Sequence, residues 1–186
     1  MTSLNQINKK FDIIYADCPW RYDFSETESR KIENHYPTCD IPTIISHKPD
    51  SAVDSVLFMW ATAPKLLEGL EVMKGWGFQY KTHAIWNKMK IGMGYWFRGQ
   101  HELLFVGTKG SPPTPDDKHT VSSIFSERRG KHSKKPDCVY RWIESAFPDQ
   151  TKLEMYARDT RPGWTSWGNE VGYVYRPVEE HNFFSN

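Results

Sequence analysis

Short apolar runs alternate with amphipathic stretches along this chain of 186 residues. Residues 11–17 (FDIIYAD) and 55–62 (SVLFMWAT) are continuous runs of mostly aliphatic and aromatic residues, so we expect two buried strands there. Partial alternation of polar and apolar positions predicts further strands at 78–86, 101–108, 121–125 and 151–158.

Helices are predicted between these strands. A short helix has Asp40 as its N-cap and Pro42 in its first turn. Pro64 opens a second helix, whose buried face would hold Leu66, Leu67, Leu70 and either Val72 or Met73. Pro136 opens a third, whose inward side would hold Val139, Trp142, Ile143 and Ala146. Segments rich in polar residues or in Gly and aromatic residues are predicted to be irregular at 21–36 and 88–100, and no element is assigned to the Trp- and Gly-rich tail at 161–173.

Strands that alternate with helices predict one α/β domain over residues 1–186, with a mostly parallel sheet and helices on both of its faces. In such sheets, ligands bind beyond the carboxyl ends of the strands. The predicted strand at 11–17 ends at Asp17, and the one at 151–158 ends at Arg158. We therefore expect both side chains at one ligand-binding edge of the sheet.

Composition narrows the class of protein. Aromatic residues make up 15% of the chain and hydrophobic residues 38%, which excludes a disordered tail. No window approaches the roughly 18 to 20 apolar residues of a membrane span, and the polar N-terminus does not resemble a secretory signal. Cys18, Cys39 and Cys138 are widely spaced, so we expect neither a disulfide scaffold nor a bound metal. These features predict a soluble, cytoplasmic domain.

Charge is distributed unevenly along the chain. The total of 24 basic against 23 acidic residues excludes a polybasic coat for nucleic acid. Between residues 79 and 135, however, 11 basic residues stand against 4 acidic ones, so this segment carries +7 and the remainder, with 13 against 19, carries −6. Such a segment is either a solvated face or a surface that contacts a phosphate backbone.

The sequence Asp17-Cys18-Pro19-Trp20 follows the first predicted strand. Pro19 has no backbone N–H and restricts the turn, which leaves carbonyl groups pointing outward. The Asp17 carboxylate and a nearby carbonyl would form a pair of acceptors suited to an exocyclic amino group, and the Trp20 ring would offer a stacking plane for a base. The alternative is a strand-end turn with a capping Asp17 and a packed Trp20.

Seven blocks follow one another along most of the chain: FDIIYADCPW, HYPT, VLFMWAT, GFQYKTHAIWNK, GMGYWFRGQHELLFVGTKG, HSKKPDCVYRWIE and LEMYARDTRPGWTSWGNE. In this order they closely resemble the adenine-N6 methyltransferase family typified by the catalytic subunit of the eukaryotic mRNA adenosine methyltransferase. The resemblance runs from about Phe11 to Glu170. The compact chain is most similar to the small bacterial and phage members.

The resemblance implies a Rossmann-like, S-adenosylmethionine-dependent methyltransferase with a permuted motif order, in which the catalytic motif is near the N-terminus and the cofactor residues lie towards the C-terminus. Asp17, Pro19 and Trp20 match the family motif D-P-P-W, and Cys18 replaces its first proline. Asp17 and the Cys18 carbonyl would accept hydrogen bonds from the adenine amino group, with Asp17 also bordering the cofactor. A catalytic thiol at Cys18 is the alternative.

Further site residues are implied by the same resemblance. Lys135 matches a family lysine near both cofactor and substrate, and Glu102 matches an acid that faces the target base. Arg158 and Asn169 match positions that hold the ribose and methionine ends of the cofactor, and Glu170 stands where the mRNA enzyme has an amide. As alternatives, Lys135 would be a solvated charge before a helix and Glu102 a structural carboxylate.

Trp96 and Arg98 lie in the Gly-rich segment 88–100. An aromatic ring beside a basic residue suits contact with an extruded base and its flanking phosphates, and it equally suits a dimer surface or a core. Core positions are expected instead for Trp60, Trp76 and Trp86.

We therefore expect an enzyme that transfers a methyl group from S-adenosylmethionine to the N6 amino group of adenine in a polynucleotide. DNA is the preferred substrate, because of the similarity to small bacterial and phage members, and the cell would be a bacterium or a phage-infected host. The alternatives are an RNA methyltransferase of the same mechanism, a catalytically inactive subunit that binds nucleic acid, and a methyltransferase of small amines or free nucleotides. Sequence selectivity would come from the chain's own loops, a homo-oligomer or a partner subunit.

Overall fold

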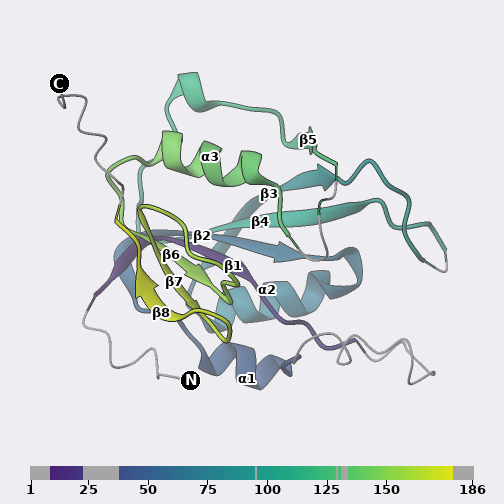
Figure 1. The fold of residues 1–186 in the computed structure, drawn as a ribbon, viewed down its shortest axis with the longest axis horizontal. Coiled ribbons are helices and arrows are strands. Elements are labelled where there is room, and N and C mark those ends of the chain that lie inside the picture. The colour runs from purple at the N-terminus through teal and green to yellow at the C-terminus, as the bar shows by residue number, and fades with distance from the viewer. Residues whose placement is uncertain (1–8, 23–37, 95, 129, 131–133, 178–186) are drawn as a thin grey trace, which may run out of the picture.

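The computed structural model describes residues 9–22, 38–94, 96–128, 130 and 134–177. Most of the predicted loop at 21–36 and of the HYPT block lies outside the described residues. Within the described residues, eight strands form one sheet in the order β5-β3-β4-β2-β1-β6-β7-β8 (Figure 1). The strands are β1 (Phe11–Asp17), β2 (Ser51–Ala61), β3 (Gln79–Asn87), β4 (His101–Lys109), β5 (Ile124–Ser126), β6 (Lys152–Met155), β7 (Trp164–Gly168) and β8 (Gly172–Tyr175).

The sheet is mixed, with parallel strands at its centre. β1 pairs in parallel with both β2 and β6, as do β6 with β7 and β3 with β5. The pairs β2–β4, β3–β4 and β7–β8 are antiparallel. A mostly parallel sheet is therefore confirmed by four of these seven pairings. Antiparallel pairing at β7–β8 follows from the short connection between these strands, because a parallel pair needs a longer crossover.

The Trp- and Gly-rich tail at 161–173, where no element is predicted from the sequence, contains β7 and the first part of β8. Trp164 and Trp167 are buried in different apolar clusters, one on each face of the sheet. Gly168 and Gly172 lie on either side of the turn between the strands, and Gly172 has a φ of +71°. Glycines are unusual within strands, so the sequence carries no clear signal for this pairing. The predicted strand at 151–158 is shortened to β6, because Tyr156 has a φ of 62°.

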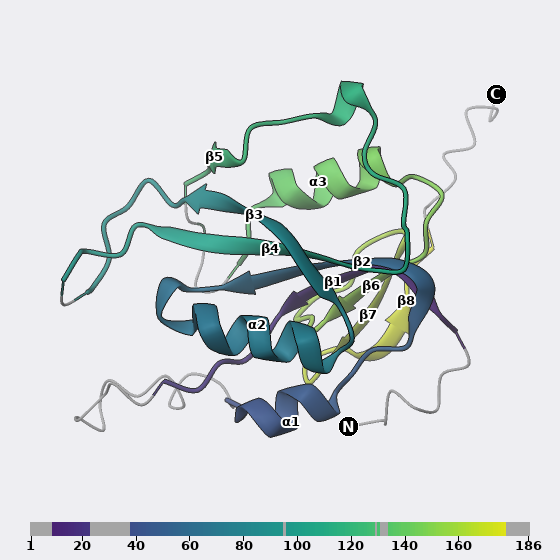
Figure 2. The same cartoon turned by 180° about the vertical axis from the view of Figure 1, so that it is seen from behind.

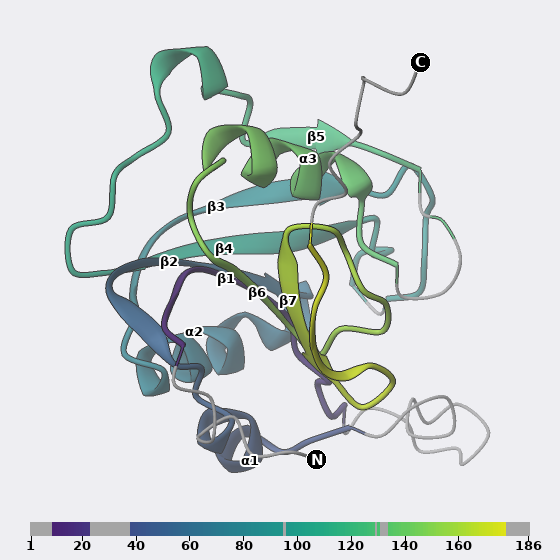
Figure 3. The same cartoon turned by 60° about the vertical axis from the view of Figure 1, so that its left-hand side comes forward.

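Helices cover both faces of the sheet, as predicted. α1 (Ile41–Ser46) and α2 (Leu66–Gly75) pack on one face and α3 (Asp137–Ala146) on the other (Figures 2 and 3). Asp40 is the N-cap of α1, as predicted, and its Oδ1 accepts a hydrogen bond from the Thr43 N–H at 2.9 Å. No helix in the described part of the chain is long and apolar enough to cross a membrane.

The predicted buried face of α2 is partly wrong. Leu67 is 75% exposed and Leu66 is 37% exposed, whereas Gly69, Val72 and Met73 are buried. A Cβ at Gly69 would lie 2.8 Å from the Phe105 ring, so the helix approaches the sheet closely through this glycine. A count of apolar side chains cannot identify this contact face, because Gly69 at its centre has no side chain.

The core is rich in indole rings, and Trp60, Trp76 and Trp86 are buried as predicted. Each of their N–H groups has an acceptor: Trp60 donates to the Tyr15 hydroxyl at 2.6 Å, and Trp76 to the Ile44 carbonyl at 3.0 Å. Trp86 donates to the Glu127 carbonyl at 2.8 Å. Burying these rings therefore leaves no indole N–H among them unsatisfied, and the bond to Ile44 joins α2 to α1.

The carboxyl ends of β1, β2, β6 and β7 meet at one edge of the sheet, because these strands are mutually parallel. Asp17 at the end of β1 lies opposite Trp60 of β2. β4 is antiparallel to β2, so its first residues, including Glu102, lie at this same edge. The topology thus brings the predicted Asp17 and Arg158 to one end of the sheet.

We predict that Gly168→Ala destabilises the fold beside this edge. A Cβ at Gly168 would lie 2.1 Å from the Ala157 carbonyl oxygen and 2.7 Å from the Ala157 nitrogen. Backbone atoms cannot move aside cheaply, so we expect the free energy of unfolding to fall by about 1–3 kcal/mol in urea denaturation. Gly130→Ala is the control, because a Cβ there meets nothing within 4 Å. Equal midpoints for the two variants would contradict the prediction.

Candidate active site

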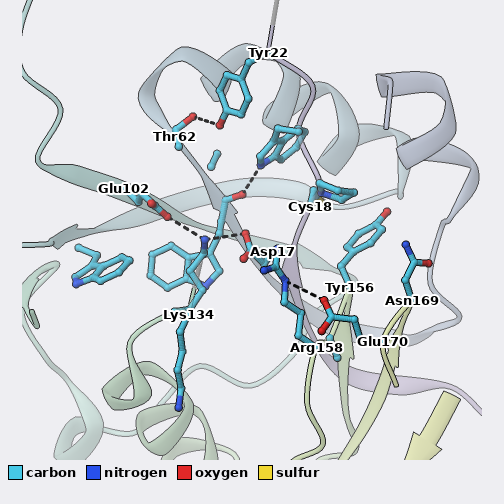
Figure 4. A pocket seen from close by; sticks show the side chains of 17 residues that line it. Asp17, Cys18, Tyr22, Thr62, Glu102, Lys134, Tyr156, Arg158, Asn169 and Glu170 are labelled. Carbon is cyan, nitrogen blue, oxygen red and sulfur yellow. Dashed lines mark hydrogen bonds and ion pairs between the residues drawn. The ribbon is translucent and has the colours of Figure 1, made fainter. Parts of the chain in front are cut away.

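A pocket of about 300 Å³ opens at the carboxyl edge of the sheet (Figure 4). The ends of β1, β2, β6 and β7, the start of β4 and the residues before α3 contribute to its walls. The pocket gathers every predicted site residue except Trp96 and Arg98, namely Asp17, Cys18, Pro19, Trp20, Glu102, Lys135, Arg158, Asn169 and Glu170.

Hydrogen bonds hold the turn that follows β1. The Trp20 N–H donates to the Cys18 carbonyl at 2.9 Å, and the Pro19 carbonyl accepts from the Cys39 N–H at 2.8 Å. The Trp20 indole N–H donates to the Trp60 carbonyl at 3.2 Å, so the ring is packed in the core and borders the pocket. A carbonyl oxygen has two lone pairs, so Cys18 can accept a second hydrogen bond, from a ligand.

The surroundings of the Cys18 thiol disfavour a catalytic role. Burial raises the pKa of this thiol well above its usual range, and the neighbouring Asp17 carboxylate raises it further. A nucleophilic cysteine requires the thiolate, which a lowered pKa would supply. The Cys18 side chain therefore packs in the core, and the residue lines the pocket without supplying a nucleophile.

Lys135 lies between two carboxylates. Its Nζ is 2.9 Å from Asp17 Oδ1 and 3.1 Å from Glu102 Oε2. Lys88 Nζ lies 3.4 Å from the other oxygen of the same glutamate, Glu102 Oε1. The side chains of Lys135 and Glu102 are only 11% and 15% exposed. Two buried ammonium groups thus balance two carboxylates, and Lys135 is a buried ion-pair partner rather than a solvated charge.

Burial and ion pairing oppose each other in this cluster. Burial raises the pKa of Asp17 above its usual range, despite the attraction of Lys135. Burial would also raise the pKa of Glu102, but Lys135 and Lys88 outweigh it and lower that pKa. Burial would lower the pKa of Lys135, but the two carboxylates raise it well above its usual range. Of the two ion-paired carboxylates, Asp17 is therefore the one whose charge is less stabilised by the protein. This is expected of an acceptor that gains a further hydrogen bond when a ligand binds.

A cation, an amide and a carboxylate form the wall that follows β6 and β7. Arg158 Nε lies 3.8 Å from Glu170 Oε1, and both side chains are more than a third exposed (Figure 4). Asn169 adjoins them at the end of β7. Tyr156 stands beside this wall, and its hydroxyl lies 3.1 Å from His47 Nδ1. These polar side chains line the pocket and remain partly exposed.

A second pocket of about 360 Å³ adjoins the first and shares Asp17 and Lys135 with it. Glu154 lines this second pocket, and its Oε1 accepts a hydrogen bond from the Tyr140 hydroxyl at 2.7 Å. Burial raises the pKa of Glu154 to about 7, even though this hydrogen bond lowers it. The site therefore contains a third buried carboxyl group beside the ion-paired two.

The structure does not bring Trp96 and Arg98 into either pocket. Both are exposed on the hairpin that joins β3 to β4, and Arg98 Nε donates to the Gly92 carbonyl at 2.9 Å. Lys88, at the base of this hairpin, pairs with Glu102. The predicted basic segment at 79–135 therefore divides into groups inside the site and groups on an exposed hairpin.

Sequence reasoning missed Trp60, Tyr156 and Glu154 as lining residues. Trp60 is a core residue, as predicted, but Lys135 Nζ also lies 5.6 Å from the centre of its ring. Tyr156 lines both pockets because its positive φ ends β6, and no signal in the sequence announces that conformation. Glu154 did carry a signal, because an acid within an apolar strand is costly to bury unless it has a partner.

The family model MT-A70 matches residues 11–170, which is most of the chain. The chain therefore belongs to the MT-A70 family. This confirms the family resemblance, and the mixed α/β sheet with helices on both faces is compatible with a Rossmann-like methyltransferase.

The relatives fall into two groups, one named as a Type II methyltransferase and the other as N(6)-adenosine-methyltransferases. The chain is 34% identical to the "Type II methyltransferase M.MunI" of Mycoplasma sp, over 88% of this chain and 78% of that protein. It is 31% identical to the "Putative N(6)-adenosine-methyltransferase MT-A70-like" of Medicago truncatula and 27% to the human "N(6)-adenosine-methyltransferase catalytic subunit METTL3". These matches cover 92% and 89% of this chain, but only 28% and 29% of the plant and human proteins.

We predict that Glu154→Gln flattens the dependence of stability on pH. The folded pKa of about 7 exceeds the unfolded value, so the stability that Glu154 contributes is present below about pH 4.5 and is lost as pH rises through about 7. The variant should avoid a loss of roughly 3 kcal/mol between pH 4.5 and 8. Urea denaturation at both pH values measures this, with the exposed Glu71→Gln as control. The same loss in wild type and Glu154→Gln would contradict it.

Proposed function

We propose that this protein transfers a methyl group from S-adenosylmethionine to the N6 amino group of adenine in DNA. Membership of the MT-A70 family and the names of the plant and human relatives bear out adenine N6 methylation, which the sequence predicted. The bacterial relative, which is named a Type II methyltransferase and of which the chain covers 78%, supports DNA as the substrate. RNA methylation by the same mechanism is the alternative, and the N(6)-adenosine relatives favour it.

The observation that carries the proposal is the pair of acceptors at the end of β1. Asp17 and Cys18 both line the pocket, and Lys135 holds Asp17 Oδ1 at 2.9 Å. An exocyclic amino group has two N–H donors, which two adjacent acceptors can hold in one orientation. A carboxylate of raised pKa gains more than a well-paired one from such a donor.

Positioning is the main task of the chain's own residues in this reaction. Asp17 Oδ2 and the Cys18 carbonyl would accept hydrogen bonds from the two amino N–H groups, which directs the nitrogen lone pair towards the methyl donor. Lys135 and Glu102 fix the orientation of the Asp17 carboxylate. Burial of this cluster strengthens each hydrogen bond and excludes water. Holding two reactants in line can supply several kcal/mol of barrier lowering, and because proton loss follows the transfer, no further base is needed.

The residues of the site fit S-adenosylmethionine. Its ribose hydroxyl groups suit the oxygens of Asn169 and Glu170, and its amino-acid carboxylate suits the Arg158 guanidinium. The adjoining pockets, of about 300 and 360 Å³, lie in the size range of small-molecule sites. Asp17 and Lys135 line both pockets and would stand where cofactor and adenine meet. When bound, the cofactor supplies an electrophilic methyl group.

The order of these groups along the chain supports a permuted methyltransferase. The acceptor pair follows β1, and the cofactor groups follow β6 and β7. We include in the proposal that residues 1–186 form a single methyltransferase domain and that it acts in the cytoplasm of a bacterium or a phage-infected host. The basic segment at 79–135 supports a polynucleotide over a small amine or free nucleotide.

An inactive nucleic-acid-binding subunit is the competing hypothesis. The complete set of Asp17, Glu102 and Lys135, joined by ion pairs, favours an active enzyme. The decisive experiment incubates the protein with labelled S-adenosylmethionine and DNA, RNA or free adenosine, and identifies the methylated nucleoside by mass. We expect N6-methyladenine in DNA. Label in no substrate would support the inactive subunit, and label in RNA alone would establish the alternative substrate.

We predict that Asp17→Ala abolishes methylation and leaves the fold intact. Losing an aimed acceptor should cost on the order of 3 kcal/mol of barrier lowering, or a hundredfold or more in rate. Lys135 keeps Glu102 as an ion-pair partner at 3.1 Å in the variant, so the fold should remain intact. Rates with labelled cofactor and thermal denaturation measure the two effects. The control is Asp54→Ala, near the opposite end of β2. Near wild-type turnover would remove Asp17 from the mechanism.

We predict that Asn169→Ala weakens cofactor binding specifically. Loss of one polar partner should cost about 1–2 kcal/mol, or roughly a tenfold rise in Kd for S-adenosylmethionine by calorimetry. Affinity for nucleic acid should change much less. An unchanged Kd for the cofactor would mean that the end of β7 is structural.

A further inference from the structure

The hairpin between β3 and β4, residues 88–100, projects beyond the body of the molecule (Figures 1 and 2). We call these residues the arm; the structure describes all of them except residue 95. Neither pocket is lined by the arm. The function proposed above therefore leaves it without a role.

The arm is held in shape by backbone contacts. The Gly92 N–H donates to the Gly99 carbonyl at 2.7 Å, and the Gly99 N–H donates to the Met93 carbonyl at 3.0 Å. A Cβ at Gly94 would lie 2.0 Å from the Phe97 carbonyl oxygen, so the tip closes only because that residue is glycine. The glycines thus build a defined hairpin rather than a loose linker.

This hairpin presents large apolar side chains to solvent. Trp96 is 96% exposed, Phe97 is 90% exposed and Met93 is 78% exposed. Side chains of this size are rarely left in water in such a cluster unless they meet a partner. Met89 and Ile91 continue the apolar surface towards the base of the arm.

The charge and position of the arm indicate which partner it meets. Its sequence has three basic residues, Lys88, Lys90 and Arg98, and no acidic one, which suits a polyanion. Its base is tied to the site, because Lys88 pairs with Glu102 and Glu102 pairs with Lys135. A surface for a second copy of the chain would bring like charges together if two arms met.

The site itself requires that a duplex be opened. Asp17, Glu102 and Lys135 line a pocket and their side chains are at most 29% exposed, so the N6 group of a stacked, paired adenine cannot reach them. Apolar side chains inserted between base steps unstack and kink a duplex, and aromatic rings also stack on bases that have been freed. An aromatic tip on a hairpin whose base is tied to the site has the properties that this step requires.

We propose that the arm is a wedge for double-stranded DNA, in which Trp96 and Phe97 insert at the target adenine while Lys90 and Arg98 contact the flanking phosphates. This inference rests on the function proposed above and adds how the adenine reaches the pocket. The wedge acts on the duplex and not on the transferred methyl group. The wedge should therefore increase the rate for an adenine that is stacked in a duplex and have little effect on one that is already unstacked.

The experiment compares native and heat-denatured unmethylated plasmid DNA as substrates for wild type and for the double variant Trp96→Ala/Phe97→Ala. We expect the double variant to lose at least tenfold in initial rate on native DNA and less than threefold on denatured DNA. Trp96→Phe should retain most of the activity on native DNA, because it keeps a ring that can stack. Leu67→Ala is the control, since Leu67 is also an exposed apolar residue, and both rates should be unchanged. An unchanged cofactor Kd verifies that each variant folds.

Other results would overturn the wedge. Equal losses on both forms of DNA, no loss on either, or wild-type activity on single strands alone would show that the arm does not open a duplex. Sedimentation that shows a wild-type dimer becoming a monomer in the double variant would assign the arm to a second copy instead. A wild type that methylates no polynucleotide contradicts the proposed function and the wedge together, whereas an active wild type with an unaffected double variant contradicts the wedge alone.

Discussion

Lys135 joins three parts of the chain through one buried ammonium group, and the candidate active site depends on it. Asp17 ends β1, Glu102 begins β4, and Lys135 lies just before α3, with contacts of 2.9 and 3.1 Å. Two carboxylates at this depth would repel each other and remain poorly solvated without a cation between them. The strand order that places β1, β2 and β4 side by side therefore brings Asp17 and Glu102 within reach of the same lysine.

The turn after β1 shows how the chain tolerates Cys18 where the family motif has a proline. A proline would restrict φ by its ring, whereas here hydrogen bonds on either side hold the segment. The Cys18 carbonyl accepts from Trp20, and the next carbonyl accepts from Cys39 at 2.8 Å. The buried thiol adds packing without chemistry, because its pKa is raised by burial. The backbone carbonyl that the proposed reaction needs is thus fixed by tertiary contacts.

Much of the candidate site could be predicted from the sequence, because it follows strand ends and family blocks. Asp17, Lys135, Glu102 and Arg158 were each assigned from such patterns, and all four line one pocket. The position of Glu154 in a second pocket could not be predicted, because it depends on which strand lies beside β1 and on where α3 places Tyr140. For Trp96, a ring near a basic residue indicates a base contact, a dimer surface or a core equally well, and the separation of Trp96 from the pocket is a consequence of hairpin geometry.

The local elements β1 and α1 follow from the sequence alone, because an apolar run and an N-cap act within a few residues. The family and the acceptor motif at Asp17 also follow from it, because they reside in short blocks. Only the tertiary structure decided the buried face of α2, the existence of β7 and β8, and the ion-paired state of Lys88. Each of these depends on a close approach between residues distant in sequence, at Gly69, at Gly168 and at Glu102. Such contacts arise only when the sheet has formed, so no local pattern of hydrophobic and polar residues could announce them.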